Sequence, residues 1–596
     1  MQRILLRLEN GALVATLAAL ALLPILEIAL RAAFHIGVSG AGAFTQHFAL
    51  IAGMLGAAVA AREGRLLSLS ALQGMLTGPR LAAARALSGV VAATVSALLC
   101  VGSFEFVLAE RSGGNVIAYG IPVWLGEAVL PIGFALIAVR LVLACARSWS
   151  WRIAVFAIAA GVAAAAMSRI PLGHVVTLAA LAVLLVATVL GSPVFTTLGG
   201  AALVLFWAEG LPIASIALDH YRLVVNTSLP MIPLFTLAGY FLAEGGSPRR
   251  LIRVCNALFA GLRGGPAIVT VVACAFFTSF SGASGVTIIA LGGMLMPLLL
   301  SAGYSEKGAL GLLTGAGSVG GLLPPGLPLV LFAIVAKVSI EEMFLAGILP
   351  GLLMVALVAA WGVWQAKPRP SNACFDRHEL RDALLDARWE LALPLVPLGV
   401  LFSGLATVVE AAAVTAVYAF VVQVLVHKDI DLGRDVPRVM VECGLLVGGI
   451  LLILGVALGL TNYFVDAGIP ERAVDWGRQV FDSKWSFLLA LNVFLLIAGC
   501  LLDIFSATVV LVPLLLPLGV AFGIHPLHLG IIFLANMELG YLTPPVGMNL
   551  FFAAYRFGKP IGEVFRAALP AALVLAVGVA LITFLPGLAM AFIARP

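Results

Sequence analysis

The sequence predicts an all-α polytopic membrane protein. Three observations lead to this fold class: an apolar composition, long apolar runs, and an internal repeat of proline-broken segments. Hydrophobic residues make up 62% of the 596 residues and charged residues only 11%, whereas soluble globular chains carry about 25% charged residues. Apolar runs long enough to cross roughly 30 Å of hydrocarbon recur between residues 11 and 593. At roughly 20 residues per span plus loops, we expect on the order of sixteen membrane segments.

Composition and motifs also exclude several classes of function. The chain has no Walker A sequence, nucleophile elbow or metal-ligand spacing, so we expect neither an enzyme nor a bound cofactor. Its seven cysteines form no CxxC or His-flanked cluster, which argues against a disulfide framework or metal centre. The net charge of +5 is small and lies in loops, so it bears on membrane topology and not on nucleic-acid binding.

Residues 1–150 are predicted to form a separate scaffold unit of four helices, from apolar runs at about 11–30, 44–61, 83–107 and 122–146. Arginines gather in the second loop and are absent from the first, so the positive-inside rule places both ends of the unit in the cytoplasm. No convincing cleavage site follows the first run, and we expect an uncleaved helix with a cytoplasmic N-terminus. A further apolar run at 153–167 predicts a linker membrane helix within residues 151–171.

The remaining residues, 172–596, contain two halves that repeat each other at a spacing of 220 residues. Prolines coincide without gaps at four positions: Pro297, Pro324, Pro325 and Pro350 align with Pro517, Pro544, Pro545 and Pro570. Paired apolar segments interrupted by Pro or Gly are typical of secondary transporters and indicate where their binding sites lie. We therefore predict a transporter, with the inversion of one half relative to the other as a hypothesis. Basic loops at 247–263, 367–388 and 428–438 are expected in the cytoplasm.

An apolar run that is interrupted by small and polar residues precedes each Pro-Pro pair. Small and polar residues at 278–285 interrupt the run 268–300, and residues 499–506 interrupt the run 487–516. This pattern suits a re-entrant hairpin with its tip near the membrane midplane, where irregular backbone must be covered by protein or line a cavity. Close helix packing is the alternative, because Gly, Ala and Ser also let helices approach each other.

The Pro-Pro pairs predict two broken helices, at 317–325 and 536–545. Proline lacks the N–H of a helical hydrogen bond, so carbonyls on its N-terminal side lose their donors. Such carbonyls suit Na⁺, and discontinuous helices hold coupling ions in this way. A hydroxyl from Thr543 or Ser281 can add a neutral ligand. A plain proline kink in a packed helix is the alternative.

Four polar residues in apolar surroundings have open roles. Asp503 at the second hairpin tip can cap a helix or balance a cation. Glu410 can cap a helix or line a substrate cavity. Asn536 and Asn549, on either side of the second break, can bond to substrate or to the freed backbone.

Several motifs together carry a family resemblance. In the first half they are residues 232–235, 264–271, 281–284, Gly317-Ser318, Pro324-Pro325 and 346–351. In the second half they are residues 410–412 and 536–547. With these motifs the chain resembles the membrane part of a tripartite ATP-independent periplasmic (TRAP) transporter, in the form that fuses the small and large permease subunits. The resemblance covers most of residues 190–590. In residues 1–150 it is weaker and rests on 120–124 and 131–133.

The resemblance implies a sodium-driven elevator with inverted repeats, two re-entrant hairpins and two Pro-Pro-broken helices. A transport domain at about 264–350 and 486–570 slides across scaffold helices that the small-permease-like unit enlarges. A periplasmic substrate-binding protein delivers a small organic acid, usually a carboxylate. The implied first sodium site is Ser279, Ser281, Gly320, Leu323 and Pro325. The implied second site is Gly499, Gly540, Thr543 and Val546. We place the substrate cavity at Ser284, Asp503, Asn536 and Asn549.

The resemblance also implies a monomeric fused permease in the bacterial inner membrane, surrounded by lipid. A self-sufficient elevator-type symporter for dicarboxylates or other anions, which needs no binding protein, is the alternative. The additional four-helix unit argues against it, because such carriers enlarge their scaffold by dimerising. The sequence leaves the acid unidentified, because the binding protein performs most of that selection.

Overall fold

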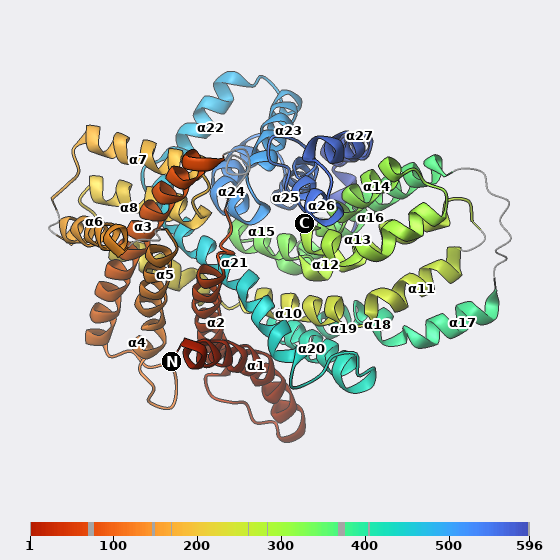
Figure 1. The fold of residues 1–596 in the computed structure, drawn as a ribbon, viewed down its shortest axis with the longest axis horizontal. Coiled ribbons are helices and arrows are strands. Elements are labelled where there is room, and N and C mark those ends of the chain that lie inside the picture. Colours follow the sequence, from red (N-terminus) through yellow and green to blue (C-terminus); the bar gives the residue numbers. More distant parts are fainter. Residues whose placement is uncertain are drawn as a thin grey trace. The chain divides into compact units, whose positions relative to one another are not determined.

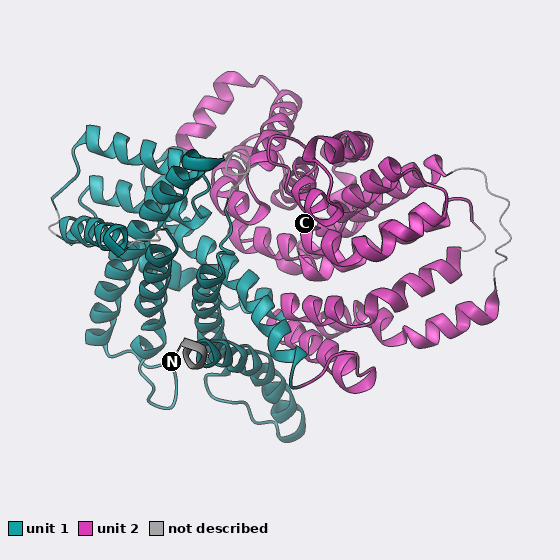
Figure 2. Cartoon of the chain, viewed as in Figure 1, with its two compact units in different colours: residues 1–234, 433–469 teal, residues 235–432, 470–596 magenta. Residues whose placement is uncertain are grey.

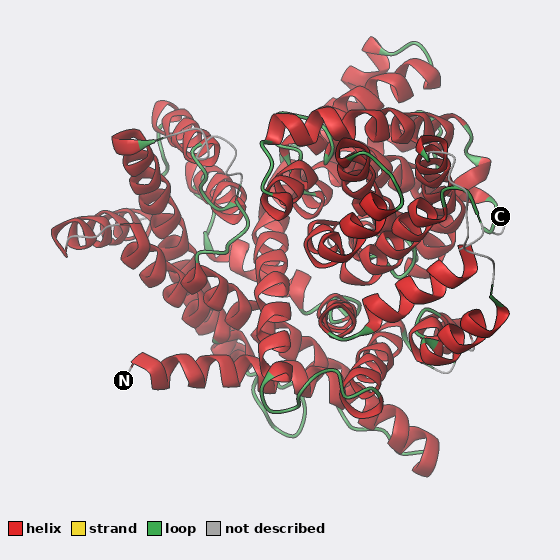
Figure 3. Cartoon of the chain, turned by 45° about the vertical axis from the view of Figure 1, so that its right-hand side comes forward, coloured by secondary structure: helices red, strands yellow, loops and turns green. Residues whose placement is uncertain are grey.

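The computed structural model describes residues 2–68, 77–145, 149–167, 170–259, 262–282, 284–366, 376–402, 404 and 406–593. Within these ranges every regular element is a helix (Figures 1 and 3). Twelve helices there are long and apolar enough to cross a membrane, or thirteen if one bent pair counts as a span. This is fewer than the roughly sixteen segments expected, because five further apolar helices have only 10–17 residues.

The chain divides into two compact units (Figure 2). Unit 1 comprises residues 1–234 and 433–469, and unit 2 comprises residues 235–432 and 470–596. The helices of unit 1 are α1 Gln2–Phe34, α2 Ala41–Glu63, α3 Gly78–Gly113, α4 Val123–Glu127, α5 Val129–Cys145, α6 Trp149–Met167, α7 His174–Val189, α8 Val194–Ala208, α9 Ala214–Val224 and α21 Asp435–Asp466. The predicted ranges 11–30, 44–61 and 83–107 lie within α1, α2 and α3, and the linker helix at 153–167 lies within α6. The fourth predicted range, 122–146, is divided between α4 and α5, and its last residue lies outside the described residues. The domain boundaries at 150 and 171 stay predictions.

Unit 1 is built around α21. In the most apolar 18-residue stretch of this helix, 89% of the residues are buried. Glycines let α2 and α21 meet backbone to backbone. A Cβ added to Gly56 would overlap the carbonyl of Gly444, and one added to Gly448 would overlap the N atom of Ala57. Small residues give helices this close approach inside a membrane, where packing rather than hydrophobicity drives association. An N-terminal helix and a helix more than 370 residues later thus share one core.

Unit 2 contains the repeat as two series of helices. The first series is α12 Gly265–Ser281, α13 Ser284–Ser301, α14 Glu306–Ser318, the 3₁₀ helix η2 Val319–Leu322, α15 Leu327–Ala336 and α16 Ile340–Gln365. The second is α23 Lys484–Leu501, α24 Ile504–Ala521, α25 Pro526–Gly540, α26 Met548–Phe557 and α27 Ile561–Phe584. The starts and the ends of α13 and α24 are both 220 residues apart (504 − 284 and 521 − 301), and so are the starts of α14 and α25 (526 − 306). The helix bounds therefore follow the spacing of the prolines.

The arms of the two hairpins, α12–α13 and α23–α24, are longer than the sequence indicated. Three of these arms, α13, α23 and α24, are long and apolar enough to cross a membrane on length and composition. The re-entrant depth of the hairpins stays a prediction.

The other helices of unit 2 are α10 Met231–Glu244, which begins in unit 1, α11 Ser247–Phe259, α17 Arg377–Asp386, α18 Arg388–Ala392, α19 Leu395–Phe402, α20 Val408–Phe420, the π helix η3 Val421–Val426, α22 Ile469–Val480 and α28 Gly587–Met590. Two of the basic segments predicted as loops, 247–263 and 367–388, thus contain the helices α11 and α17. Both are amphipathic: Val254 and Ala257 of α11 pack on Ala383 of α17, while Arg253 pairs with Glu379 at 2.8 Å. Charge alone indicated a loop, but the apolar face makes each segment a helix.

A buried charge cluster fixes α11 within unit 2. The Arg250 guanidinium lies 2.6 Å from Glu390, which is fully buried, and 2.8 Å from Asp429. Gln423 of η3 donates to Ser247 at 2.7 Å and completes the cluster. The pKa of Asp429 lies below its usual value. Partial burial by itself would raise this pKa, but the hydrogen bonds from Arg250 and the Gly246 N–H favour the carboxylate and outweigh that effect.

Candidate functional site

The two broken helices have the same backbone arrangement. At the first break, α14 and η2 end before Pro324-Pro325, and the chain turns by 42° into α15. At the second, α25 ends before Pro544-Pro545, and α26 follows. Both Pro-Pro peptide bonds are cis. Because proline has no N–H, the carbonyls four residues earlier, those of Gly320 and Gly540, lack a helical donor.

Each of these two carbonyls instead accepts from the backbone N–H three residues later. Leu323 N donates to Gly320 O at 3.1 Å, and Thr543 N donates to Gly540 O at 3.0 Å. A carbonyl oxygen has a second lone pair. That of Gly320 can also face a cation, whereas that of Gly540 accepts from the Thr543 hydroxyl at 2.9 Å. The implied ligands Gly320 and Leu323 of the first site thus correspond to Gly540 and Thr543 of the second.

Each of these glycines lies where a hairpin helix meets a broken helix. A Cβ on Gly320 would lie 2.5 Å from the Ala275 carbonyl oxygen of α12, and one on Gly540 would lie 2.5 Å from the Gly499 carbonyl carbon of α23. Only a residue without a side chain allows this approach. The structure therefore brings Gly499 and Gly540 together, and it gives the glycines a packing role whether or not an ion binds.

Hydroxyl groups surround the first hairpin tip. Thr278 Oγ1 lies 2.9 Å from Thr287 Oγ1 and 3.0 Å from the Gly317 carbonyl. Ser281 Oγ lies 3.5 Å from Thr287 Oγ1, and the Ser279 hydroxyl donates to the Phe276 carbonyl at 2.8 Å. All four of these side chains are buried. The predicted ligands Ser279 and Ser281 thus lie in a neutral, oxygen-rich turn beside the first break.

The second site is more open. Pro544 and Pro545 are exposed, and Val546 is half-buried, whereas Pro325 is buried at the first break. The Thr543 hydroxyl donates to Gly540 O at 2.9 Å. Gly547 N donates to Cys500 O at 3.3 Å and ties the hairpin to the residue after Val546.

Two of the four predicted substrate residues meet. The Ser284 hydroxyl donates to Asn549 Oδ1 at 2.7 Å, and Asn549 Nδ2 donates to the Ser318 hydroxyl at 2.6 Å. This chain of bonds joins α13, α14 and α26, and all three side chains are buried. It links the first hairpin and the first break to the second broken helix.

The other two predicted substrate residues have different partners. Asn536 Nδ2 donates to Asn492 Oδ1 at 2.8 Å, and Asn492 also accepts from Thr583 at 3.0 Å. Asp503 caps α24: its carboxylate accepts from Phe505 N and Ser506 N, each at 3.0 Å, and from the Ser506 hydroxyl at 2.5 Å. A role for either in substrate binding stays a prediction.

Glu410 also acts as a cap. Its carboxylate accepts from Thr407 N at 2.7 Å, while the Thr407 hydroxyl accepts from Glu410 N at 3.3 Å. This reciprocal capping box starts α20. Of the two roles left open by the sequence, the structure shows the cap.

Sequence reasoning assigned no site role to several buried polar residues near the breaks. Ser318 and Asn492 are partners of predicted residues, and Tyr541 accepts from Ile504 N at 2.6 Å. Glu538, near the end of α25, is 4% exposed. A comparison of the two halves could have drawn attention to Glu538. The equivalent residue, 220 positions earlier, is Ser318, so the two halves differ there by a carboxyl group in place of a hydroxyl group.

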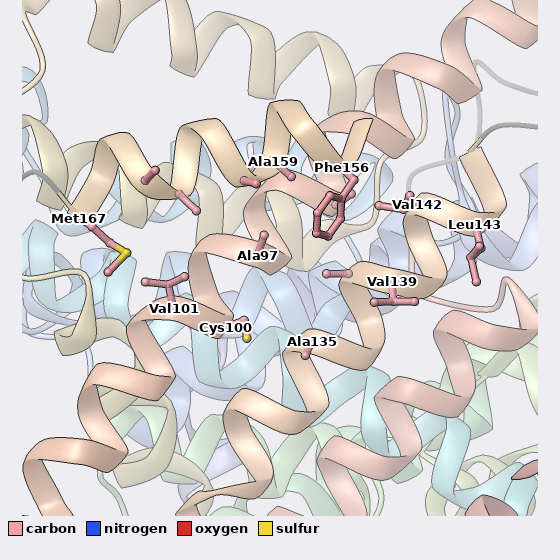
Figure 4. Close-up of a pocket in the computed structure, with 15 residues that line it drawn as sticks. Ala97, Cys100, Val101, Ala135, Val139, Val142, Leu143, Phe156, Ala159 and Met167 are labelled. Atoms are coloured by element: carbon pink, nitrogen blue, oxygen red, sulfur yellow. The ribbon is translucent and has the colours of Figure 1, made fainter. Parts of the chain in front are cut away.

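A separate cavity lies in unit 1 among α3, α5 and α6 (Figure 4). Its volume is about 460 Å³, and its lining includes Cys100, Val139, Val142, Phe156 and Met167. No charged side chain lines it. An organic anion moved there would lose its hydration without gaining charged donors, so the lining does not suit an anion.

Both parts of the chain match families of known proteins. Residues 178–588 match the model of the tripartite ATP-independent periplasmic transporter, DctM component, and residues 20–151 match that of the DctQ component. The chain is 36% identical over 399 residues to the C4-dicarboxylate TRAP transporter large permease protein DctM of Pseudomonas aeruginosa, covering 66% of this chain and 92% of that protein.

A fused relative matches across both parts. The chain is 31% identical over 487 residues to the isethionate TRAP transporter permease protein DctMQ of Oleidesulfovibrio alaskensis, covering 80% of this chain and 76% of that protein. Among solved structures, it is similar to the Alcanivorax borkumensis YdaH transporter at 17% identity and a TM-score of 0.43, over 60% of this chain and 85% of that one. A likeness at that level says nothing about mechanism.

Proposed function

Because this chain belongs to the tripartite ATP-independent periplasmic transporter family, as a fusion of its small and large permease components, we propose that it couples Na⁺ entry to the uptake of a small organic acid. It is a multi-pass inner-membrane protein, and a periplasmic substrate-binding protein delivers the acid to it. The N-terminus is cytoplasmic in this proposal. One fused chain acts as the permease.

One observation carries the sodium proposal: the equivalence of the two breaks. Gly320 O and Gly540 O each lose a helical donor to a proline four residues later, and each is packed on its own hairpin. Two neutral oxygen-lined turns are therefore available, and neutral oxygens suit a monovalent cation. The first ion is held by Ser279, Ser281, Gly320, Leu323 and Pro325, and the second by Gly499, Gly540, Thr543 and Val546.

The proposed movement is an elevator. Both hairpins pack on their breaks, and Ser284, Asn549 and Ser318 join the two halves by hydrogen bonds. Residues of about 264–350 and 486–570 therefore move as one body, with their halves inverted, against scaffold helices that include residues 1–150. Ions bound at both breaks hold the hairpins closed over the substrate.

The substrate is a small organic acid of carboxylate type. Relatives are named for a C4-dicarboxylate and for isethionate. At the junction of the two halves, Asn549 lies beside Ser284 and has a second amide N–H as a neutral donor. Asn536 and Asp503 lie on the second half. Neutral donors suit an anion that enters together with cations.

The test is uptake of radiolabelled candidate acids into proteoliposomes. With an inward sodium gradient, the chain alone should show little uptake, and adding the substrate-loaded binding protein should restore it. Robust uptake by the chain alone would instead support the self-sufficient symporter.

A further inference from the structure

Glu538 is a buried carboxyl group with an incomplete environment. It is 4% exposed, and its Oε2 atom is buried with no hydrogen-bond partner among the described residues. None of the ion pairs in the described part of the chain includes it. By contrast, the nearby Asp503 accepts three hydrogen bonds.

This carboxyl group lies close to both breaks. Glu538 precedes Gly540 of the second break by two residues, and its Oε1 atom lies against Gly321 of the first break, where an added Cβ would overlap it. Gly321 directly follows Gly320. The repeat places Tyr541 at the position equivalent to Gly321 and Ser318 at that of Glu538. A missing side chain in one half therefore makes room for a carboxyl group from the other.

An ionised carboxylate without a partner is strongly unfavourable in a low-dielectric interior. A cation within several ångströms offsets that cost, because Coulomb attraction is strong where water is excluded. We infer that the Glu538 carboxylate is the common counter-charge for the two sodium ions, placed between the breaks that hold them. This inference rests on the proposed sodium sites. Glu538 touches neither ion in this role and acts as a positioning residue through its charge.

The experiment compares sodium binding in the full-length chain and its variants. Sodium-dependent thermal stabilisation is measured in detergent, with choline replacing sodium, and the sodium midpoint of uptake is measured with the binding protein present. Glu538→Gln should raise both midpoints by about tenfold or more, whereas Glu538→Asp, which keeps the charge, should stay within roughly threefold of the unmodified chain.

Two further readouts separate this role from a structural one. Without sodium, Glu538→Gln should melt no lower than the unmodified chain, since glutamine has nearly the same shape and needs no counter-charge; replacing a purely structural glutamate would lower the melting temperature. Glu127→Gln is the matched control, because Glu127 is also buried with an unpartnered Oε2 but belongs to unit 1. Its sodium midpoint should not change.

The outcomes are distinguishable. If the unmodified chain responds to sodium and Glu538→Gln keeps the same midpoint, the counter-charge role is wrong while the sodium proposal stands. If the unmodified chain shows no sodium response, the sodium proposal itself fails, and this inference fails with it. Should Glu538→Gln not fold, Gly321→Ala displaces the carboxyl group without removing it: a raised midpoint supports the role, and an unchanged one overturns it.

Discussion

The first hairpin–break segment, residues 265–336, and the second, residues 484–557, share their backbone but differ in charge. Both have a hairpin, a broken helix and a glycine at the point of contact. Around the first tip and break the polar side chains are hydroxyls, whereas the second contributes Asp503 and Glu538. The repeat preserves the backbone geometry of the two breaks, but at the described tips and breaks the buried acidic side chains come from the second half. In the proposed function, equal ion sites therefore do not require equal side chains.

The largest expected effect is on the stability of the fold. It comes from comparing α11 of the first half with α22, the amphipathic helix at the corresponding place in the second half. Arg250→Ala leaves the fully buried Glu390 without its cation, and breaking a buried pair costs roughly 3–5 kcal/mol. Arg472→Ala in α22 removes an exposed charge and should change stability by less than about 0.5 kcal/mol. Thermal unfolding in detergent checks both. Equal losses would mean that Arg250 does not hold α11.

The next effect tests whether the breaks are equivalent. Gly320→Val and Gly540→Val each place side-chain atoms about where backbone atoms of a hairpin lie, 2.5 Å from the new Cβ. Such overpacking costs roughly 1–3 kcal/mol, so each variant should lose most uptake and raise the sodium midpoint, and the two should act alike.

Gly562→Val is the control for the two glycine variants, since a Cβ there meets nothing within 4 Å. Its sodium response should match that of the unmodified chain. A normal sodium response in either break variant, with folded protein confirmed, would show that the two breaks are not equivalent ion sites.

The smallest effect concerns a side chain that only the second break has. Thr543→Ala removes the hydroxyl that bonds to Gly540 O at 2.9 Å. A lost ligand of this kind is worth roughly 1–3 kcal/mol if uncompensated, and the half-buried position lets water replace it in part. We expect a modest rise in the sodium midpoint of uptake, smaller than that of Gly540→Val. An effect as large as that of the valine would mean that Thr543 holds the break together.

The repeat was predictable because proline acts locally. The missing N–H at Pro324 and Pro544 ends η2 and α25 just before the Pro-Pro pairs. The other matched prolines, such as Pro297 and Pro517, lie inside α13 and α24, whose bounds also match. The capping of α24 by Asp503 was also among the predicted roles, since an N-cap lies next to the helix that it starts.

Other features had no local signal. The bonds of Asn549 to Ser284 and Ser318 join residues more than 200 positions apart, and no periodicity reports such contacts. Fewer described helices than expected are long enough to cross a membrane, because apolar helices such as α8 and α10 are short. The segment of α11 was predicted as a loop because the prediction used its charged residues and left out the apolar residues on its other face.

The central claim is that the two hairpin–break segments move as one body. Single cysteines near Ser281 and Ser506 report on the two hairpins, and a cysteine near Leu130 reports on the predicted scaffold. Their labelling by a membrane-impermeant thiol reagent is measured in conditions that favour inward and outward states, in a background without the native cysteines. Residues 281 and 506 should change accessibility together, while residue 130 stays constant. Equal changes at all three positions, or a change at only one hairpin, would contradict the account.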